Sequence, residues 1–313
     1  MKTTQPLNKK KPLRSIIKSD LKMNKALYFM VLPVLAFYFI FCYIPMAGVI
    51  ISFQDYHPAL GILKSPWVGL TNYIDFFSSN YFVRLLFNTL RISVCSLILG
   101  FPAPIILALL INELKSKRYA KVVQTATYMP HFISLVIVVS LIKTFTDQGS
   151  IFELIYEKIT GESISLLMLP KAFVPIYVIS NIWQGCGWDS ILYIAALTAV
   201  DPQLYEACKM DGGGKVRQLI SVTLPAIAPT IITMLILRIG NILSVGYEKI
   251  ILMYNQLTYS TADVISTFVY RKGLEEMNWS YSTAVGVFNS VINVIFLTAA
   301  NLISRKVSET SLW

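Results

Sequence analysis

The sequence predicts an all-α membrane protein with six transmembrane helices and both termini in the cytoplasm. Of its 313 residues, 55% are hydrophobic and only 14% are charged, and the mean hydropathy is +0.60. A soluble domain is about a quarter charged, so this composition fits a protein whose surroundings are largely lipid. Six apolar stretches reach the roughly 20 residues that a bilayer core of about 30 Å requires. None of them alternates with a period of two residues, and because backbone polar groups in lipid must pair within their own segment, each stretch is expected to be a helix.

The predicted spans cover residues 27–52, 88–111, 122–144, 172–200, 226–246 and 281–303. The first span resembles a signal peptide in its position, but its apolar core exceeds the 7–15 residues of such a segment. A basic leader also precedes it. We therefore predict that the first span is retained as a transmembrane helix.

Lysine and arginine are distributed unevenly between the two sides of this arrangement. Of the 27 Lys and Arg residues, 17 lie in the N-terminal leader, the second-to-third connection, the fourth-to-fifth connection and the C-terminal tail, whereas 7 lie in the loops on the other side. Cytoplasmic loops carry the excess of basic residues in membrane proteins. The chain is thus predicted to consist of a cytoplasmic segment 1–26, a six-helix domain 27–303 and a cytoplasmic tail 304–313.

Charge and side-chain inventory exclude several other classes of protein. The net charge of +10 does not indicate nucleic-acid binding, because there is no soluble domain to carry a basic face. His57 and His131 are too far apart to suggest a metal site, and His131 in the motif MPHF is expected to be structural. No metal site and no catalytic group is predicted. The cysteines lack metal-binding or redox spacing and are expected to be unpaired packing residues: Cys42, Cys95, Cys186 and Cys208.

The connection between the fourth and fifth spans contains the motif DGGGK, which invites comparison with a phosphate-binding loop. Such a loop reads G-x-x-x-x-G-K-[ST], because backbone N–H groups hold the phosphates and a hydroxyl reaches the metal ion. Here Lys209 stands where the first glycine is required, and Val216 stands where the hydroxyl is required. The connection is therefore not expected to bind a nucleotide itself.

A helix–turn–helix explains the same connection better. Asp201 is a suitable N-cap for a helix that begins at Pro202, and Gly212 or Gly213 can supply a left-handed stop. A second short helix is expected before the next span, whose start Pro225 suits because it lacks an N–H group. From the residues alone, this connection is as well explained by a structural elbow as by a docking element.

The stretch EACKMDGGGKVRQLISVTLP resembles the EAA loop of importer-type ABC permeases, in which E-A-A is followed by a glycine and, nine residues later, by a hydrophobic-x-L-P sequence. Two positions depart from the pattern, since Cys208 replaces the second alanine and Gly213 replaces a common alanine. The resemblance implies that residues 201–225, called the coupling loop below, dock on a partner ATPase. The residues that it assigns to this coupling are Glu206, Ala207, Lys209, Asp211, Gly212, Leu224 and Pro225.

The resemblance extends over residues 27–306, through blocks such as QTATYMPHFISLVIV and NIWQGCGWDSILYIAAL. These blocks are similar, in order, to LplB-like polysaccharide and oligosaccharide permeases. The resemblance implies the type I ABC importer permease fold in a bacterial cytoplasmic membrane. It also implies a second, paralogous permease, two ATPase subunits that bind ATP and Mg²⁺, an extracytoplasmic solute-binding lipoprotein and an oligosaccharide substrate, with no cofactor in this chain.

Polar residues inside the predicted spans are candidates for a substrate path, because such groups are costly in lipid and normally face a cavity or a partner. In the fourth span, Asn181, Gln184 and Trp188 follow a helical spacing. The alternative is that such residues join helices by hydrogen bonds, and the residues leave both interpretations open, as they do for a pairing of Arg238 with Asp189. The candidates are Asn181, Gln184, Gly185, Trp188, Asp189, Arg238, Asn241, Asn289 and Asn293.

A self-sufficient secondary carrier or channel is the alternative class of transporter. A carrier should show inverted repeats with broken helices, and a potassium channel should show a TVGYG-like filter. The sequence shows neither, so an ATP-driven importer subunit is the leading hypothesis. The external loop after the third span, with the motif IFELIYEKI, is expected to form a short amphipathic helix at the membrane surface or against a binding protein.

Overall fold

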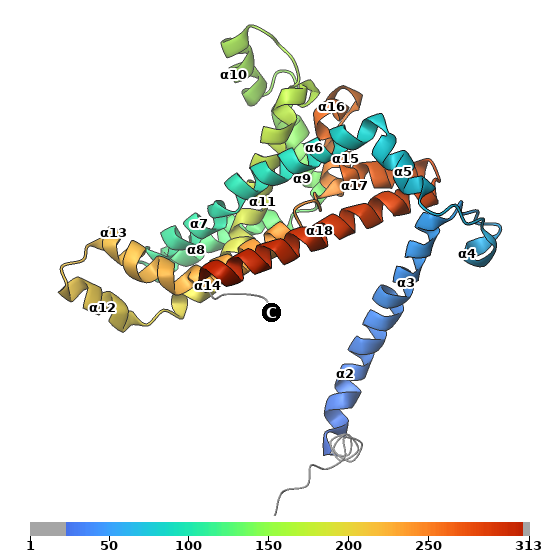
Figure 1. Cartoon of the computed structure of the whole chain (residues 1–313). Coiled ribbons are helices and arrows are strands. Elements are labelled where there is room, and N and C mark those ends of the chain that lie inside the picture. Colours follow the sequence, from blue (N-terminus) through green and yellow to red (C-terminus); the bar gives the residue numbers. More distant parts are fainter. Residues whose placement is uncertain (1–22, 309–313) are drawn as a thin grey trace, which may run out of the picture. The chain divides into compact units, whose positions relative to one another are not determined.

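The computed structural model describes residues 23–308, so most of the predicted N-terminal segment and the end of the predicted tail lie outside the described residues. Within the described range the chain is helical apart from loops and one isolated β-bridge, between Gln54 and Trp67. It forms two units, which divide between Ile51 and Ser52, and each is considered by itself. Figure 1 shows the elements.

The first unit is one helical stretch that changes its winding along its length. It comprises α2 (Lys25–Tyr38), a π-helical turn (Phe39–Tyr43), α3 (Ile44–Met46) and a 3-10 stretch that continues to Phe53. Its residues are strongly apolar, with a mean hydropathy of 2.3 in the most apolar window. This agrees with the first predicted span.

The second unit is a helical bundle with short helices at its ends. Its longer helices are α6 (Asn80–Cys95), α7 (Pro102–Asn112), α8 (Lys117–Tyr128), α9 (Leu135–Thr146), α11 (Pro170–Thr198), α14 (Leu224–Gly240) and α18 (Trp279–Ser308). The shorter ones are α4 (Gly61–Lys64), α5 (Thr71–Ser78), α10 (Ile151–Thr160), α12 (Pro202–Met210), α13 (Lys215–Gln218), α15 (Tyr247–Met253), α16 (Tyr259–Ala262) and α17 (Ile265–Tyr270). The π-helical turn Ser96–Gly100 joins α6 to α7.

Five stretches of the described chain are long and apolar enough to cross a membrane, against the six that the sequence predicts. They are Lys25–Phe53, Asn80–Asn112, Leu135–Thr160, Lys215–Gly240 and Trp279–Lys306. The predicted fourth span corresponds to α11, which is a single helix of 29 residues but is not among the five. The same polar residues that make α11 a candidate for the substrate path also lower its hydropathy.

The predicted third span, residues 122–144, is wrong as a continuous helix. The chain leaves α8 at Tyr128, makes a 3-10 turn over Met129–Phe132 and resumes at Leu135. Pro130 causes the break, because it has no N–H to donate and its ring clashes with the preceding turn. Ser134 then caps α9 by accepting a hydrogen bond from the Ile137 N–H.

The predicted boundary at Pro225 is also wrong. Lys215 to Gly240 is one helical stretch, in which α13 passes through a π-helical turn (Leu219–Thr223) into α14. Pro225 lies in the first turn of α14, where its missing N–H is tolerated because the π-helical turn has already altered the hydrogen-bond pattern. The predicted short second helix is therefore the beginning of the fifth long stretch, and this stretch ends at Gly240 rather than at residue 246.

The short helix predicted from the motif IFELIYEKI is present. It is α10 (Ile151–Thr160), capped by Ser150 and closed by Gly161 in the left-handed conformation, with φ of 77°. The buried carboxylate of Glu153 accepts hydrogen bonds from the Gly149 N–H at 3.0 Å and the Ser163 hydroxyl at 2.7 Å, and thereby fixes the loops on both sides of the helix.

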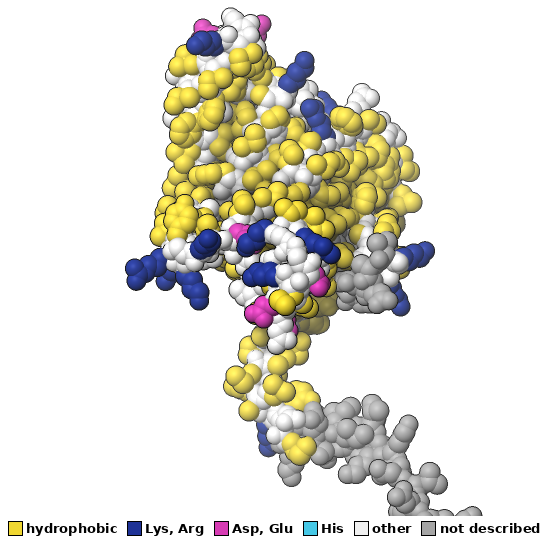
Figure 2. All heavy atoms as spheres, turned by 90° about the vertical axis from the view of Figure 1, so that its left-hand side faces the viewer, with side chains coloured by type: hydrophobic (Ala, Val, Ile, Leu, Met, Phe, Trp, Pro, Cys, Tyr) yellow, Lys and Arg dark blue, Asp and Glu magenta, His cyan; other side chains and the backbone are white. Residues whose placement is uncertain are grey.

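Three clusters of buried apolar side chains hold the second unit together. The largest joins α6, α9, α11 and α15 around Phe173 and Ile250, and a second joins α5, α6, α17 and α18 around Phe76 and Phe268. The third joins α7, α11 and α14 around Ile227. Figure 2 shows a face with an almost uncharged hydrophobic wall, below which basic side chains gather where α12 and α13 lie.

Candidate functional site

The helices of the second unit enclose a polar cavity of about 240 Å³, called the central cavity here. One wall is the non-helical segment 241–246, which begins where α14 ends. Non-helical backbone at membrane depth is tolerated where it lines a cavity. The lining residues are Ser93, Ser96, Leu97, Tyr177, Asn181, Arg238, Asn241, Ile242, Ser244, Val245 and Gly246.

Side chains from α6, α17 and α18 hold the segment 241–246 in place. The hydroxyl of Ser93 donates to the Ile242 carbonyl, and that of Ser266 donates to the Val245 carbonyl at 3.1 Å. On the opposite side, Asn293 Oδ1 accepts from the Leu243 N–H at 3.0 Å. These bonds satisfy backbone groups that the end of the helix leaves unpaired.

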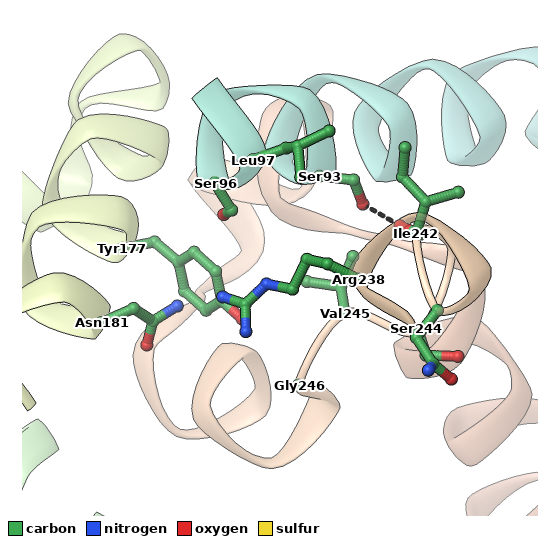
Figure 3. Close-up of a pocket in the computed structure, with 11 residues that line it drawn as sticks. Ser93, Ser96, Leu97, Tyr177, Asn181, Arg238, Ile242, Ser244, Val245 and Gly246 are labelled. Atoms are coloured by element: carbon green, nitrogen blue, oxygen red, sulfur yellow. Dashed lines mark hydrogen bonds between the residues drawn. The ribbon is translucent and has the colours of Figure 1, made fainter. Parts of the chain in front are cut away.

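Two basic side chains approach the central cavity from different helices. The guanidinium of Arg238 reaches toward Tyr177 and Asn181 (Figure 3). Lys249, which is 4% exposed, donates from Nζ to Asn181 Oδ1 at 2.7 Å. Burial lowers the pKa of Lys249 to about 8. Asn181 is thus held through its amide oxygen by Lys249 beside the central cavity, which it lines.

Asp189 and Arg238 line the same neighbouring cavities but do not form a close pair. Both line a cavity of about 430 Å³, called the Trp188 cavity, and a smaller one of about 40 Å³. Among the ion pairs within 4.0 Å in the described part of the chain, none joins the two residues. A pairing between them, left open by the sequence, is absent from this conformation.

Trp188 is the centre of an aromatic cluster that includes the break between α8 and α9. The imidazole of His131 stacks on the indole with a centroid distance of 4.6 Å and an interplanar angle of 1°, and Phe132 meets it edge-on at 5.6 Å. Trp188 itself is 44% exposed. The indole is therefore held on one side by His131 while part of its surface remains open to the Trp188 cavity.

The α8–α11 crossing beside Trp188 is unusually close. A Cβ atom added to Gly187 would lie 2.1 Å from the carbonyl oxygen of Thr127. Gly185, which the sequence singled out, has only Asp189 Oδ2 within 4 Å, at 3.9 Å. Gly187 is thus the glycine that this crossing requires.

The remaining candidates of the substrate path are placed differently from one another. Gln184 and Gly185 are half-buried on α11 and line none of the three cavities described above. Asn293 is used by bonds within the chain, because its Nδ2 also donates to Ser244 Oγ at 3.0 Å. Asn289, one turn earlier, lines a separate cavity between α17 and α18.

The coupling loop is a helix–turn–helix, as the sequence predicts. Asp201 caps α12 by accepting from the Gln203 N–H at 2.9 Å, and Gly212 ends it in the left-handed conformation, with φ of 76°. Gln218 Nε2 in α13 then donates to the Gly213 carbonyl in the turn, and Tyr205 in α12 bonds to Thr223 in the π-helical turn. Glu206, Ala207, Lys209, Asp211 and Gly212 are exposed, Leu224 is half-buried and Pro225 is exposed.

The two departures from the EAA pattern contact each other. A Cβ atom at Gly213 would lie 2.5 Å from Cys208 Sγ and 2.6 Å from the Cys208 carbonyl oxygen. The Cys208 side chain, which is larger than that of alanine, thus occupies the space beside Gly213, which has no side chain. The additional glycine does not loosen this turn, since Gly213 is buried and its N–H donates to the Cys208 carbonyl at 2.8 Å.

Sequence reasoning missed several residues at these sites. Tyr177 lies one turn before Asn181 on α11, so the spacing i, i+4 could have found it. Lys249 enters the sequence analysis only as one of the basic residues in the loops. It contacts Asn181, from which it is separated by 68 positions in the sequence. The structural role predicted for His131 agrees with its stacking on Trp188, but nothing local in the sequence indicates that partner. Glu113, which forms an ion pair with Lys215 at 2.6 Å, belongs to no sequence motif that would indicate this contact.

The bundle of long apolar helices, the polar cavity and the exposed helix–turn–helix together define a membrane transport component. The family described as binding-protein-dependent transport system inner membrane component matches residues 100–309. The chain belongs to this family, and it is a multi-pass inner-membrane permease of an ABC importer, in which ATP hydrolysis is performed by partner subunits. The family predicted from the sequence is confirmed.

Two relatives from Bacillus subtilis (strain 168) match almost throughout. Protein LplB is 47% identical over 295 residues, covering 94% of this chain and 92% of the relative. The polygalacturonan/rhamnogalacturonan transport system permease protein YteP is 46% identical over 307 residues, covering 97% and 95%.

A solved structure shows the same fold. One chain in the crystal structure of a bacterial ABC transporter involved in the import of the acidic polysaccharide alginate is 42% identical to this chain, with a TM-score of 0.85. The match covers 93% of this chain and 99% of the other. A second crystal structure, of a bacterial alginate ABC transporter in complex with an alginate pentasaccharide-bound periplasmic protein, matches equally well.

Proposed function

We propose that this permease moves an oligosaccharide or polysaccharide fragment across the cytoplasmic membrane by alternating access. The observation that carries the proposal is the pair of adjoining cavities that share Arg238 and present Asn181, Ser96 and Trp188. Saccharides offer hydroxyl groups for hydrogen bonds and flat C–H faces for aromatic rings, and amide, hydroxyl and indole groups suit both. The polysaccharide substrates of YteP and of the alginate transporter support the same class.

Ser96 adds a specific argument for a ligand in the central cavity. Its hydroxyl oxygen is buried and has no hydrogen-bond partner among the described residues. Such a group costs about 1–3 kcal/mol when left unsatisfied. A hydroxyl of a bound sugar, or the water that it displaces, would supply the missing bond.

We propose the remaining subunits of the transporter on the basis of the family and of the exposed coupling loop. A second, paralogous permease completes the path, and two ATPase subunits hold ATP and Mg²⁺, while this chain holds no cofactor. An extracytoplasmic solute-binding protein delivers the saccharide, as the periplasmic protein in the alginate complex suggests. The loop residues Glu206, Lys209 and Asp211 are exposed and so are available to an ATPase groove.

The topology that we propose has six spans, with α11 as the fourth. Residues 27–303 form the permease domain, and the N-terminal segment 1–26, the coupling loop and the tail 304–313 are cytoplasmic. The excess of basic residues on this side supports the orientation. An impermeant thiol reagent should label a cysteine introduced at Ser116 only after the cells are permeabilised; labelling in intact cells would reverse the topology and remove the basis for a docking loop.

The Trp188→Ala variant tests the substrate path. We expect uptake of an oligogalacturonate to fall up to about ten-fold, because aromatic contacts worth about 0.5–1.5 kcal/mol are lost with the indole. The ATPase subunits should still co-purify, since Trp188 lies outside the coupling loop. Uptake is measured with the whole importer in proteoliposomes. Wild-type uptake by Trp188→Ala, Asn181→Ala and Arg238→Gln alike would refute the proposed path.

The Glu206→Lys and Gly212→Val variants test the coupling loop. Gly212 requires a left-handed conformation that costs a residue with a Cβ atom about 1–2 kcal/mol, and Glu206 is exposed on α12, where charge reversal should weaken a contact rather than the fold. We expect both variants to insert normally but to lose the ATPase or its stimulation by substrate.

The matched control is Gly214→Ala in the same loop, because a Cβ atom there meets nothing within 4 Å and the backbone is extended. It should assemble and hydrolyse ATP like the wild type. If Glu206→Lys and Gly212→Val do so as well, the loop is only an elbow. Transport that continues without ATP would instead favour a self-sufficient carrier.

A further inference from the structure

A cavity of about 410 Å³ opens between α17 and α18, apart from the central cavity. We call it the α17–α18 cavity. Residue Tyr247 lines it, and the three residues before Tyr247 line the central cavity. The two cavities therefore flank one short stretch of chain. Ser266, which lines the second cavity, also holds this stretch through its bond to the Val245 carbonyl.

The lining of the α17–α18 cavity is mainly aromatic and aliphatic, with a few polar groups, and carries no charged side chain among the described residues. Tyr247 and Tyr270 form a tilted pair with ring centroids 5.8 Å apart. Trp279 is fixed edge-on by Tyr56 at 6.0 Å. Three rings from three elements, α15, α17 and α18, thus border one space.

Asn289 supplies an unused hydrogen-bond acceptor on α18 in the same cavity. Its Oδ1 atom is buried and has no hydrogen-bond partner in the described part of the chain. The contrast with Asn293, one turn further along α18, is direct, because both ends of that amide are bonded within the chain. A lone buried acceptor is costly unless a ligand or water completes it.

We propose that the α17–α18 cavity is a second saccharide-binding subsite, in which Tyr247, Tyr270 and Trp279 contact a sugar face and Asn289 accepts a hydrogen bond from a sugar hydroxyl. This rests on the proposed function, since it assigns a further position to the same substrate. An oligosaccharide longer than the central cavity needs additional positions, and this cavity is adjacent along the chain to the segment 241–246. Its lining, which has no charged side chain, suits the hydroxyl groups and the C–H face of a sugar ring.

Gly286 offers a way to fill the cavity without removing any contact. It lies within α18 and lines the cavity, and a Cβ atom added there meets nothing within 4 Å. In the reconstituted importer, we expect Gly286→Leu to raise the concentration of tetragalacturonate that gives half-maximal uptake by about ten-fold, because the added side chain occupies space that the sugar needs. The control is Ser290→Leu, one turn further on α18, which is exposed and outside the cavity lining and should leave this concentration unchanged.

The two asparagines provide a second matched comparison. Asn289→Leu should raise the half-maximal concentration about five-fold, as expected for one lost hydrogen bond, while the melting temperature of the purified permease stays at the wild-type value. Asn293→Leu should lower the melting temperature, because it breaks both bonds that join α18 to the segment 241–246. An equal loss of stability in the two variants would mean that Asn289 is structural and would overturn its role.

Protection from alkylation measures occupancy directly. Leu274 lines the cavity and is 58% exposed, so a cysteine there, in a background with the four native cysteines replaced by serine, should react with N-ethylmaleimide. Tetragalacturonate should slow this reaction several-fold. If the importer transports tetragalacturonate but protection is absent and Gly286→Leu and Asn289→Leu show wild-type uptake curves, the subsite is refuted and the proposed function stands. If the wild-type importer transports no saccharide, both fall together.

Discussion

Gly187→Ala should prevent the permease from folding into a stable bundle, although it adds only one methyl group. The new Cβ atom would lie 2.1 Å from the Thr127 carbonyl oxygen, 2.4 Å from its carbon and 3.0 Å from the Tyr128 nitrogen. These are backbone atoms, which cannot rotate away as a flexible side chain could, so α8 and α11 must separate. Overpacking of this kind costs about 1–3 kcal/mol and more where the backbone has to move.

Gly185→Ala is the matched control for this expectation. It lies on the same helix two residues earlier and places its Cβ atom no closer than 3.9 Å to another atom. Replacing glycine by alanine within a helix is favourable by up to about 1 kcal/mol, so this variant should be neutral or slightly stabilised. The measurement is the yield of monodisperse permease in detergent and its melting temperature. Equal yields and melting temperatures for the two variants would show that the helices do not cross as closely as described.

Arg271→Ala should destabilise the connection between the last two long helices by about 3–5 kcal/mol, because it leaves a buried carboxylate without its main partner. Asp263 is fully buried and receives two hydrogen bonds from Arg271, at 2.7 and 3.2 Å. Burial opposes the charge of the guanidinium, yet the hydrogen bonds and the charge of Asp263 outweigh it and raise the pKa of Arg271. Thr267 at 2.8 Å and Arg84 at 3.9 Å remain, but neither replaces the pair.

Lys272→Ala is the control for Arg271→Ala, because the neighbouring lysine forms an ion pair with Glu276 that is partly exposed. Such pairs contribute about 1 kcal/mol or less. The melting temperature of the purified permease should fall markedly for Arg271→Ala and hardly for Lys272→Ala. Adding Asp263→Asn to Arg271→Ala should restore part of the lost melting temperature, since the uncompensated negative charge of Asp263 is removed. A failure of this restoration would mean that packing, rather than charge, is what Arg271 provides.

The local features of the coupling loop could be predicted from the sequence because local rules determine them. Asp201 accepts a bond from a backbone group two residues away, and Gly212 provides a conformation that other residues avoid. The break after Tyr128 was missed for a related reason. A hydropathy pattern registers the apolar residues on both sides of Pro130 but not the hydrogen bond that proline removes.

The candidate site was predictable only in part, because its geometry depends on contacts between distant segments. Polar residues in apolar spans identified Asn181, Arg238 and Asn241, which line one cavity. The pattern does not reveal that Lys249 holds Asn181 or that His131 stacks on Trp188. It also treats Asn289 and Asn293 alike, whereas the two amides differ in the partners that tertiary packing brings to them.

The segment 241–246 gives the central cavity a wall made of main chain as well as side chains. Its position is imposed by Ser93, Ser266 and Asn293, which belong to three other helices, and by Leu243 of the segment, which is fully buried. Exchanging the side chains of Asn241 and Val245, which line the cavity and take no part in these contacts, would therefore change what the wall presents to a substrate without releasing the wall from the bundle. In such an arrangement, the residues that contact the substrate differ from the residues that maintain the fold. Substrate specificity can therefore change through a few substitutions while the fold of the transporter is preserved.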